Sequence, residues 1–159
     1  MVRSSNQAFL QLITQLKQLI AAAGAQDEKL AVLCARLKDS VPYYNWVGVY
    51  RLDEQTKSDL ILGPFAGVPT EHIRIPFGRG ICGQTAVRQQ TMIVQDVSKA
   101  QNYRSCNPLV KAEIVVPICF SGALLGVLDI DSHERAPFTD ADRAFLEHVA
   151  ALIAPLLGG

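Results

Sequence analysis

One cysteine and three carboxylates lie at the borders of two apolar runs, and they are the residues of this chain best placed to do chemistry. Cys106 lies in a polar stretch, Glu113 opens the first apolar run, and Asp129 and Asp131 close the second. Side chains alternate faces along a strand, and residues paired in antiparallel strands have Cβ atoms roughly 4.5–5.5 Å apart. If Glu113 pairs with Asp131, all three carboxylates crowd one wall of a sheet just beyond Cys106. Such crowding either retains a proton on one carboxylate or requires a cationic or hydrogen-bonding ligand.

The turn between the two runs decides whether this cluster forms. A three-residue turn, 121–123, gives the pairing above and places Leu125 on the same face as the two aspartates. A two-residue turn shifts the pairing by one residue and sends Glu113 to the opposite face of the sheet. In that case the Asp-x-Asp sequence only marks where the strand leaves the core for solvent. The sequence leaves both interpretations open.

A second cysteine, Cys82, lies in the glycine-rich segment FGRGICG. The glycine spacing matches the dinucleotide-binding pattern G-x-G-x-x-G. We reject that interpretation because the following helix is too short for a crossover, another strand follows at once, and no acidic residue lies about twenty positions on. The glycines instead predict a tight loop that places Cys82 at a helix N-terminus, where backbone N–H groups and the helix dipole lower the pKa of a thiol. Cys82 is therefore a candidate redox cysteine.

Two aromatic residues share one face of an earlier predicted strand. In NWVGVYRL, Trp46, Gly48 and Tyr50 alternate with residues of the opposite face. An aromatic face of this kind is either plain core or the wall of a ligand pocket. Gly48 leaves room between the rings, which favours a cavity.

The elements that must position these residues follow from periodicity, capping signals and turn residues. The order predicts an α+β fold in which antiparallel hairpins carry helices. The expected helices are 6–23, 27–39, 83–89 and one from the N-cap Thr139 to Leu157, and the expected strands are 45–52, 60–65, 73–76, 92–95, 113–120 and 124–131.

Composition limits the class of protein. The 159 residues are 49% hydrophobic and carry 15 basic and 15 acidic side chains without long runs of either sign, which argues for a single domain and against nucleic-acid binding. The sequence shows neither a signal peptide nor a membrane span, so we expect a cytoplasmic protein whose four cysteines are thiols at rest. Cys34 and Cys119 lie within regular elements and are expected to be dispensable for redox chemistry. No zinc-ligand spacing is present, and we expect neither a metal nor a cofactor.

Taken together, five segments resemble the free methionine-(R)-sulfoxide reductases, which are stand-alone GAF domains. The segments are NWVGVY, IRIPFGRGICG, AEIVVPI preceded by Cys106, GVLDIDS and FTDAD. The similarity covers roughly 45–157. It implies a GAF domain with a six-stranded antiparallel sheet and flanking helices, formed by the whole chain, 1–159, with 1–41 as an N-terminal helical region and 45–157 as the core.

The resemblance also implies an activity: reduction of free L-methionine-(R)-sulfoxide by a cysteine thiolate, through a sulfenic acid and a disulfide that thioredoxin or a similar dithiol reduces. The implied catalytic residues are Cys106 and Cys82, and the implied substrate-binding residues are Trp46, Tyr50, Glu113, Asp129 and Asp131. Where family members commonly carry a further cysteine, this chain has His72. The alternatives are a GAF module that senses a small ligand without turnover and a structural dimerisation domain. The sequence leaves open whether the chain forms a homodimer.

Overall fold

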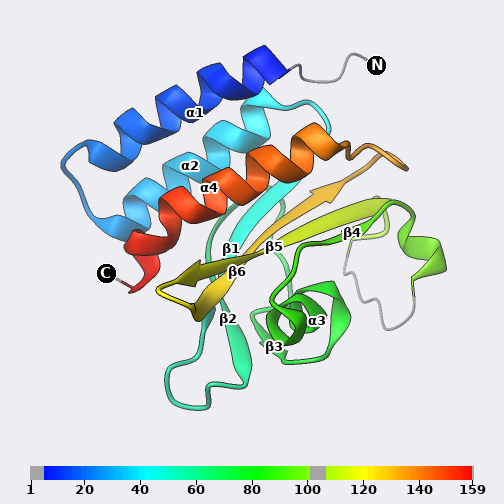
Figure 1. Cartoon of the computed structure of the whole chain (residues 1–159). Coiled ribbons are helices and arrows are strands. Elements are labelled where there is room, and N and C mark those ends of the chain that lie inside the picture. Colours follow the sequence, from blue (N-terminus) through cyan, green and yellow to red (C-terminus); the bar gives the residue numbers. More distant parts are fainter. Residues whose placement is uncertain (1–5, 101–106, 159) are drawn as a thin grey trace.

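Six strands form one antiparallel sheet in the order β3-β2-β1-β6-β5-β4 in the computed structural model, which describes residues 6–100 and 107–158 (Figure 1). The strands are β1 (Trp46–Leu52), β2 (Asp59–Ala66), β3 (Arg74–Pro76), β4 (Met92–Val94), β5 (Ala112–Phe120) and β6 (Ala123–Ser132). The helices are α1 (Asn6–Ala21), α2 (Gln26–Ser40), α3 (Gly80–Arg88) and α4 (Asp140–Gly158), with a 3-10 turn η1 (Val97–Lys99). The predicted six-stranded antiparallel sheet is confirmed.

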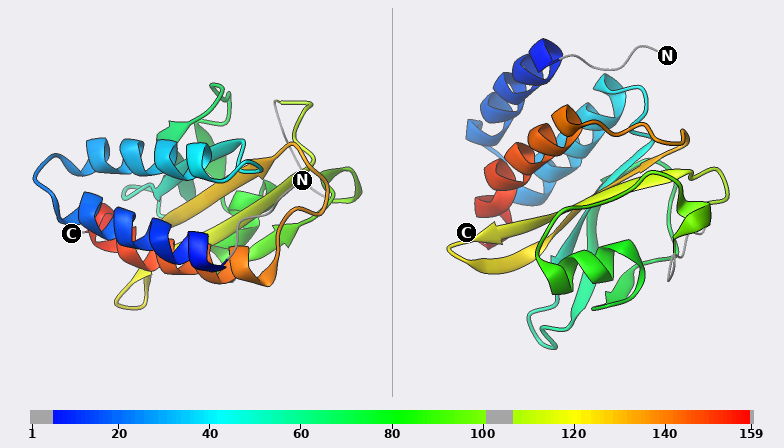
Figure 2. Two further views of the ribbon diagram at one scale, coloured as in Figure 1. Left: turned by 90° about the horizontal axis from the view of Figure 1, so that it is seen from above. Right: turned by 45° about the vertical axis from the view of Figure 1, so that its right-hand side comes forward.

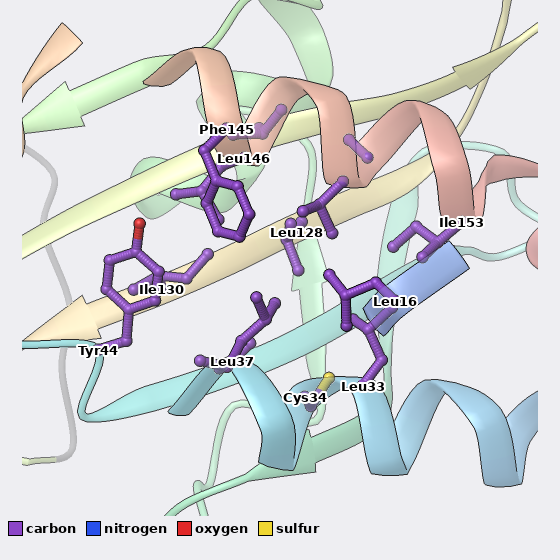
Figure 3. Packing of buried hydrophobic residues seen from close by; sticks show 14 of the residues in the cluster. Leu16, Leu33, Cys34, Leu37, Tyr44, Leu128, Ile130, Phe145, Leu146 and Ile153 are labelled. Carbon is purple, nitrogen blue, oxygen red and sulfur yellow. The ribbon is translucent and has the colours of Figure 1, made fainter. Parts of the chain in front are cut away.

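Three helices cover one face of this sheet and α3 lies on the other (Figures 1 and 2). α2 and α4 pack directly on the strands, and α1 packs against both of these helices. Phe9 of α1 stacks on Phe145 of α4 with ring centroids 4.3 Å apart. Leu16 of α1, Ile153 of α4 and Leu128 of β6 belong to the same apolar core (Figure 3). None of these helices is long and apolar enough to span a bilayer.

The connection before β1 is joined to the start of α4 by a buried carboxylate. Asp142 Oδ1 accepts hydrogen bonds from the hydroxyls of Tyr43, at 2.8 Å, and Tyr44, at 2.7 Å. Its Oδ2 accepts from the backbone N–H of Thr139 at 2.8 Å, while the N–H of Asp142 donates to Thr139 Oγ1 at 3.3 Å. This reciprocal pair is a capping box, in which Thr139 is the predicted N-cap. Through the two tyrosine hydroxyls, Asp142 also anchors the connection before β1 to the start of α4.

The turn between β5 and β6 has two residues, which is the shorter of the two turns that the sequence left open. Ser121 and Gly122 form it with φ of 52° and 81°, and Phe120 pairs with Ala123 across it. Positive φ at both positions is typical of a type I′ turn, whose twist matches the twist of the strands it joins. This turn alone would place Glu113 on the wrong face of the sheet.

A β-bulge restores the register. Ile118 pairs with Gly126 whereas the next residue of β5 pairs two positions earlier in β6, so Leu125 is an extra residue. Beyond the bulge, Glu113 pairs with Asp131, as the three-residue turn had predicted. The prediction for Leu125 is wrong, because the bulge turns its side chain to the core beneath the helices.

Candidate active site

The face of the sheet away from α1, α2 and α4 carries a cavity of about 240 Å³. Liquid water occupies roughly 30 Å³ per molecule, so the cavity has room for about eight waters or for one amino acid. Six of the seven predicted site residues line it: Trp46, Tyr50, Cys82, Glu113, Asp129 and Asp131. The seventh, Cys106, lies outside the described residues. Asn107, the next residue in the chain, lines the cavity.

Pairing among the three central strands brings the predicted residues together. β6 lies between β1 and β5, so Asp131 pairs with Trp46 on one side and with Glu113 on the other. Asp129 pairs with Gly48 of β1 and with Val115 of β5. Because side chains alternate along each strand, the aromatic and acidic side chains share the face opposite the main core.

Gly48 makes room for a neighbouring ring and not, as predicted, for the cavity itself. A Cβ atom at this position would lie 2.3 Å from Cη2 of Trp46 and 3.0 Å from Cβ of Phe65. The Trp46 ring therefore lies across Gly48, where it stacks on Phe65 at a centroid distance of 5.5 Å. Only glycine permits this position of the indole.

The polar atoms of the two aromatic residues hold the segment that closes one side of the cavity. Trp46 Nε1 donates to the carbonyl oxygen of Val68, and the Tyr50 hydroxyl donates to that of His72, each at 2.9 Å. Burial, followed by the charge of Asp129, raises the pKa of Tyr50, so its hydroxyl remains a donor. Val68 and His72 both line the cavity.

Glu113 and Asp129 form a buried carboxyl pair at the sheet wall. Glu113 is 6% exposed and Asp129 is 5% exposed. Burial raises the pKa of Glu113 far above its usual value, and the charges of Asp129 and Asp131 raise it further. Burial also raises the pKa of Asp129, but hydrogen bonds from Glu113 and Cys82 favour its charged form. The proton therefore resides on Glu113, and Asp129 carries the charge.

Cys82 is a buried thiol inside the same cluster. α3 begins at Gly80 and not at the predicted Gly83, so Cys82 is the third residue of the helix. The thiol is 4% exposed, and its Sγ lies 3.9 Å from Glu113 Oε2. Burial raises its pKa well above the ordinary value, with a further contribution from the Asp129 charge. The predicted lowering of the Cys82 pKa is wrong, because desolvation and neighbouring carboxylates outweigh the helix N-terminus.

The glycine-rich segment forms the expected tight loop. Gly78 and Gly80 adopt positive φ of 87° and 62°, and the Gly78 N–H donates to the carbonyl of Gly83 at 2.9 Å. A Cβ atom at Gly83 would lie 2.5 Å from the carbonyl oxygen of Pro76. The loop thus folds back on β3 and presses the first turn of α3 against the cavity.

The sequence prediction did not place His72 or Arg79 at the site. His72 and Arg79 line the cavity from segments before and within the glycine-rich loop. His72 Nε2 is buried without a hydrogen-bond partner, and the imidazole favours the charged form of Asp129. Neither residue belongs to a periodic element, so the strand and helix patterns carried no signal for them. His72 was noticed only as a departure from the family resemblance.

The cluster also has the residue types of a metal site. Potential ligand atoms of Cys82, Glu113 and Asp129 lie within 4.8 Å of one another. A metal would have to displace the protons of both Cys82 and Glu113, whose raised pKa values oppose this. The arrangement is better suited to holding and transferring a proton.

Comparison with known protein families matches residues 26–157 to the GAF domain family. The chain belongs to this family. The GAF domain is 35% identical to GAF domain-containing protein A of Dictyostelium discoideum, over 94% of this chain and 92% of that protein. It is 38% identical to the free methionine-R-sulfoxide reductase of Escherichia coli K12, over 80% of this chain and 72% of that protein.

Solved structures extend the similarity to the whole GAF domain. The free methionine-R-sulfoxide reductase of Neisseria meningitidis, solved in complex with its substrate, superposes with a TM-score of 0.89 at 32% identity, covering 99% of this chain and 94% of that one. The reduced form of fRMsr from Staphylococcus aureus gives a TM-score of 0.87 at 34% identity, with 99% of both chains covered. The resemblance predicted from the sequence is thereby confirmed: homologues named as these oxidoreductases align over most of the chain.

Proposed function

We propose that this GAF domain reduces free methionine-(R)-sulfoxide to methionine. The observation that carries the proposal is the buried carboxyl pair, in which protonated Glu113 and charged Asp129 face a cavity of single-amino-acid size. The pair supplies an acid and an anion side by side. Homology to enzymes named for this reaction supports the same substrate.

The first step transfers oxygen from methionine to cysteine. The Cys106 thiolate attacks the sulfoxide sulfur and forms a transient S–S bond. The original S–O bond then breaks as the oxygen bonds to the Cys106 sulfur, and the S–S bond breaks, which releases methionine and leaves Cys106 as sulfenic acid. Glu113 supplies the proton that the departing oxygen requires. The cysteine sulfur is thereby oxidised by two electrons, and the methionine sulfur is reduced by two.

Asp129 and Asp131 hold the substrate ammonium, while Trp46 and Tyr50 pack against its side chain. Asp129 Oδ1 is buried without a hydrogen-bond partner, so it is available to accept from an ammonium group. The two rings line the cavity at a centroid distance of 6.4 Å from each other. These positions suit a ligand with one charged end and a short apolar chain.

Regeneration proceeds through the thiol that lines the cavity. Cys82 condenses with the sulfenic acid on Cys106, releasing water and forming a disulfide, which an external dithiol such as thioredoxin then reduces. The raised pKa of Cys82 makes it a slow nucleophile at neutral pH, so we expect this condensation to limit the cycle.

The test is substrate selection by the purified protein. The protein is incubated with free methionine-(R)-sulfoxide, its S epimer and a peptide-bound sulfoxide, first with dithiothreitol and then with thioredoxin and its reductase. We expect methionine only from the free R epimer. Cys119→Ser is the control, because this exposed thiol does not line the cavity. Binding of methionine without any sulfoxide turnover would contradict the proposal and identify a ligand-sensing module.

A further inference from the structure

We propose that His72 is a further ligand of the substrate ammonium, and that the amino acid displaces a proton from this imidazole when it binds. The inference rests on the proposed function and adds a residue from outside the acidic wall to the ammonium site. Asp129 and Asp131 of β6 belong to that wall, whereas His72 lies in the segment between β2 and β3. Binding of the amino acid should therefore depend on pH.

His72 is fixed at the cavity with one ring nitrogen unsatisfied. Its backbone N–H donates to Thr70 Oγ1 at 3.1 Å, and its carbonyl oxygen accepts from the Tyr50 hydroxyl at 2.9 Å. The residue lines the cavity, and its Nε2 is buried without a hydrogen-bond partner. A buried polar nitrogen in this state costs free energy unless a ligand or a water supplies the partner.

Asp129 Oδ1 is a second buried atom without a partner in the same cavity. These two atoms of His72 and Asp129 are therefore not hydrogen-bonded to each other. The two side chains are nevertheless close enough to interact, because a positive charge on His72 favours the charged form of Asp129. A group that lies between them and donates to both would satisfy both atoms. An ammonium has three N–H donors, so it can do this.

The ammonium and a protonated imidazole exclude each other at this position. In the empty cavity, a positive charge on His72 stabilises the Asp129 carboxylate. The ammonium brings a second positive charge to the same carboxylate, and two like charges this close repel. A protonated imidazole has no acceptor atom, whereas the neutral ring has one nitrogen that accepts. The ring therefore gives its Nε2 proton to the solvent, and Nε2 accepts a hydrogen bond from the ammonium.

Other titrating or charged groups border the same cavity, and their protons must be distinguished from that of His72. The acidic groups come from β5, β6 and α3, and they are Glu113, Asp129, Asp131 and Cys82. Tyr50 of β1 and the cations Arg74 and Arg79 complete the set, and Glu71 beside His72 in the chain is exposed. Any proton that the ligand displaces from these groups would still be released when His72 is replaced. The difference between the wild type and a variant of His72 therefore isolates the imidazole.

Calorimetry with methionine, the product of the proposed reaction, counts the released protons. Each titration is run in two buffers of different ionisation enthalpy, between about pH 5.5 and 7.5, where an imidazole ordinarily exchanges its proton. His72→Gln keeps an acceptor oxygen but does not titrate, so it should release fewer protons than the wild type, by up to about one per chain. Methionine affinity should weaken up to about tenfold per pH unit in the wild type as the pH falls, and less than about twofold in His72→Gln.

Two further variants separate the charge of His72 from its shape. His72→Lys keeps a positive charge throughout this interval and should weaken methionine binding about tenfold near pH 7.5, because the charge repels the ammonium. His148→Gln replaces an exposed histidine of α4, on the opposite face of the sheet, and is the matched control. It should match the wild type in both affinity and proton release.

Sulfoxide turnover measured on the same samples separates this inference from the proposed function. An active wild-type protein that releases no proton, or only as many as His72→Gln, would overturn the inference alone. Methionine binding by His72→Lys as tight as that of the wild type would also overturn it, since a fixed positive charge would then be compatible with the ammonium. A wild-type protein without turnover that still releases the His72 proton on binding methionine would contradict the proposed function alone.

Discussion

Replacing Glu113 with glutamine should change how the stability of the protein depends on pH. Burial and the neighbouring carboxylates raise the pKa of Glu113, so the folded chain keeps a proton that the unfolded chain releases above about pH 4.3. Stability from this group is complete below the unfolded pKa and is lost as pH rises toward the folded pKa. Glutamine has nearly the same shape, can donate a hydrogen bond to Asp129, and does not titrate. Its profile should therefore be flatter.

One linked proton sets the size of the difference. It changes the free energy of unfolding by at most about 1.4 kcal/mol per pH unit, or about 2 kcal/mol between pH 5 and 6.5. For a domain of this length, that corresponds to a relative shift of roughly 4–8 °C in Tm. We expect Glu113→Gln to gain this much over the wild type across the interval. Urea unfolding at four pH values between these limits measures it.

The matched control is Glu54→Gln, which removes an exposed carboxyl group that does not line the cavity. Its profile should run parallel to that of the wild type. If Glu113→Gln also ran parallel, the proton assigned to Glu113 would reside elsewhere. In the same variant, loss of the acid should lower kcat for sulfoxide reduction by about 10²–10⁴-fold.

Three other substitutions, one of them with a matched control, test the resolving thiol, the exposed thiol and the buried carboxylate of α4. Cys82→Ser should release one methionine per chain but lose thioredoxin-driven cycling, and undiminished cycling would mean that another thiol resolves the Cys106 sulfenic acid. In the wild type, disulfide formation should accelerate up to about tenfold per pH unit above neutrality, because the Cys82 pKa is raised. Cys119→Ser should leave turnover unchanged and stability within about 0.5 kcal/mol, since the side chain is exposed; lost activity with an intact fold would assign this thiol a role. Asp142→Ala should lower the free energy of unfolding by about 3–5 kcal/mol in urea titrations, because two tyrosine hydroxyls lose a charged acceptor. The exposed Asp140→Ala should cost under about 1 kcal/mol, and equal losses in both variants would contradict the anchor.

The sequence predicted the sheet and its helices because strand alternation and helical periodicity are local signals. It also placed Glu113 opposite Asp131, but for the wrong physical reason. A two-residue turn and a bulge at Leu125 together give the register that a single longer turn would have given. The length of the turn and the position of the bulge both depend on how the hairpin twists against the rest of the sheet. No local sequence pattern indicates that twist.

Burial of individual polar groups could not be predicted from the sequence. The position of Cys82 near a helix N-terminus suggested a lowered thiol pKa, whereas burial, followed by the charges of Asp129 and Glu113, raises it. Both causes arise because α3 packs over β5 and β6, whose residues are distant in the chain. Arg79 was missed for another reason: it lies in a loop that has no periodic pattern, and this loop brings it to the cavity.

The central claim is that Cys106 takes the sulfoxide oxygen while the acidic cavity binds the free amino acid, and a single-turnover measurement tests it most directly. Fully reduced protein, freed of reductant, is mixed with excess free methionine-(R)-sulfoxide, and the released methionine and the intact protein mass are followed together. We predict one methionine per chain, with the mass increased by one oxygen or, after condensation with Cys82, decreased by two hydrogens. Cys106→Ser should release none. Absence of methionine from the wild type, or undiminished release from Cys106→Ser, would contradict the claim.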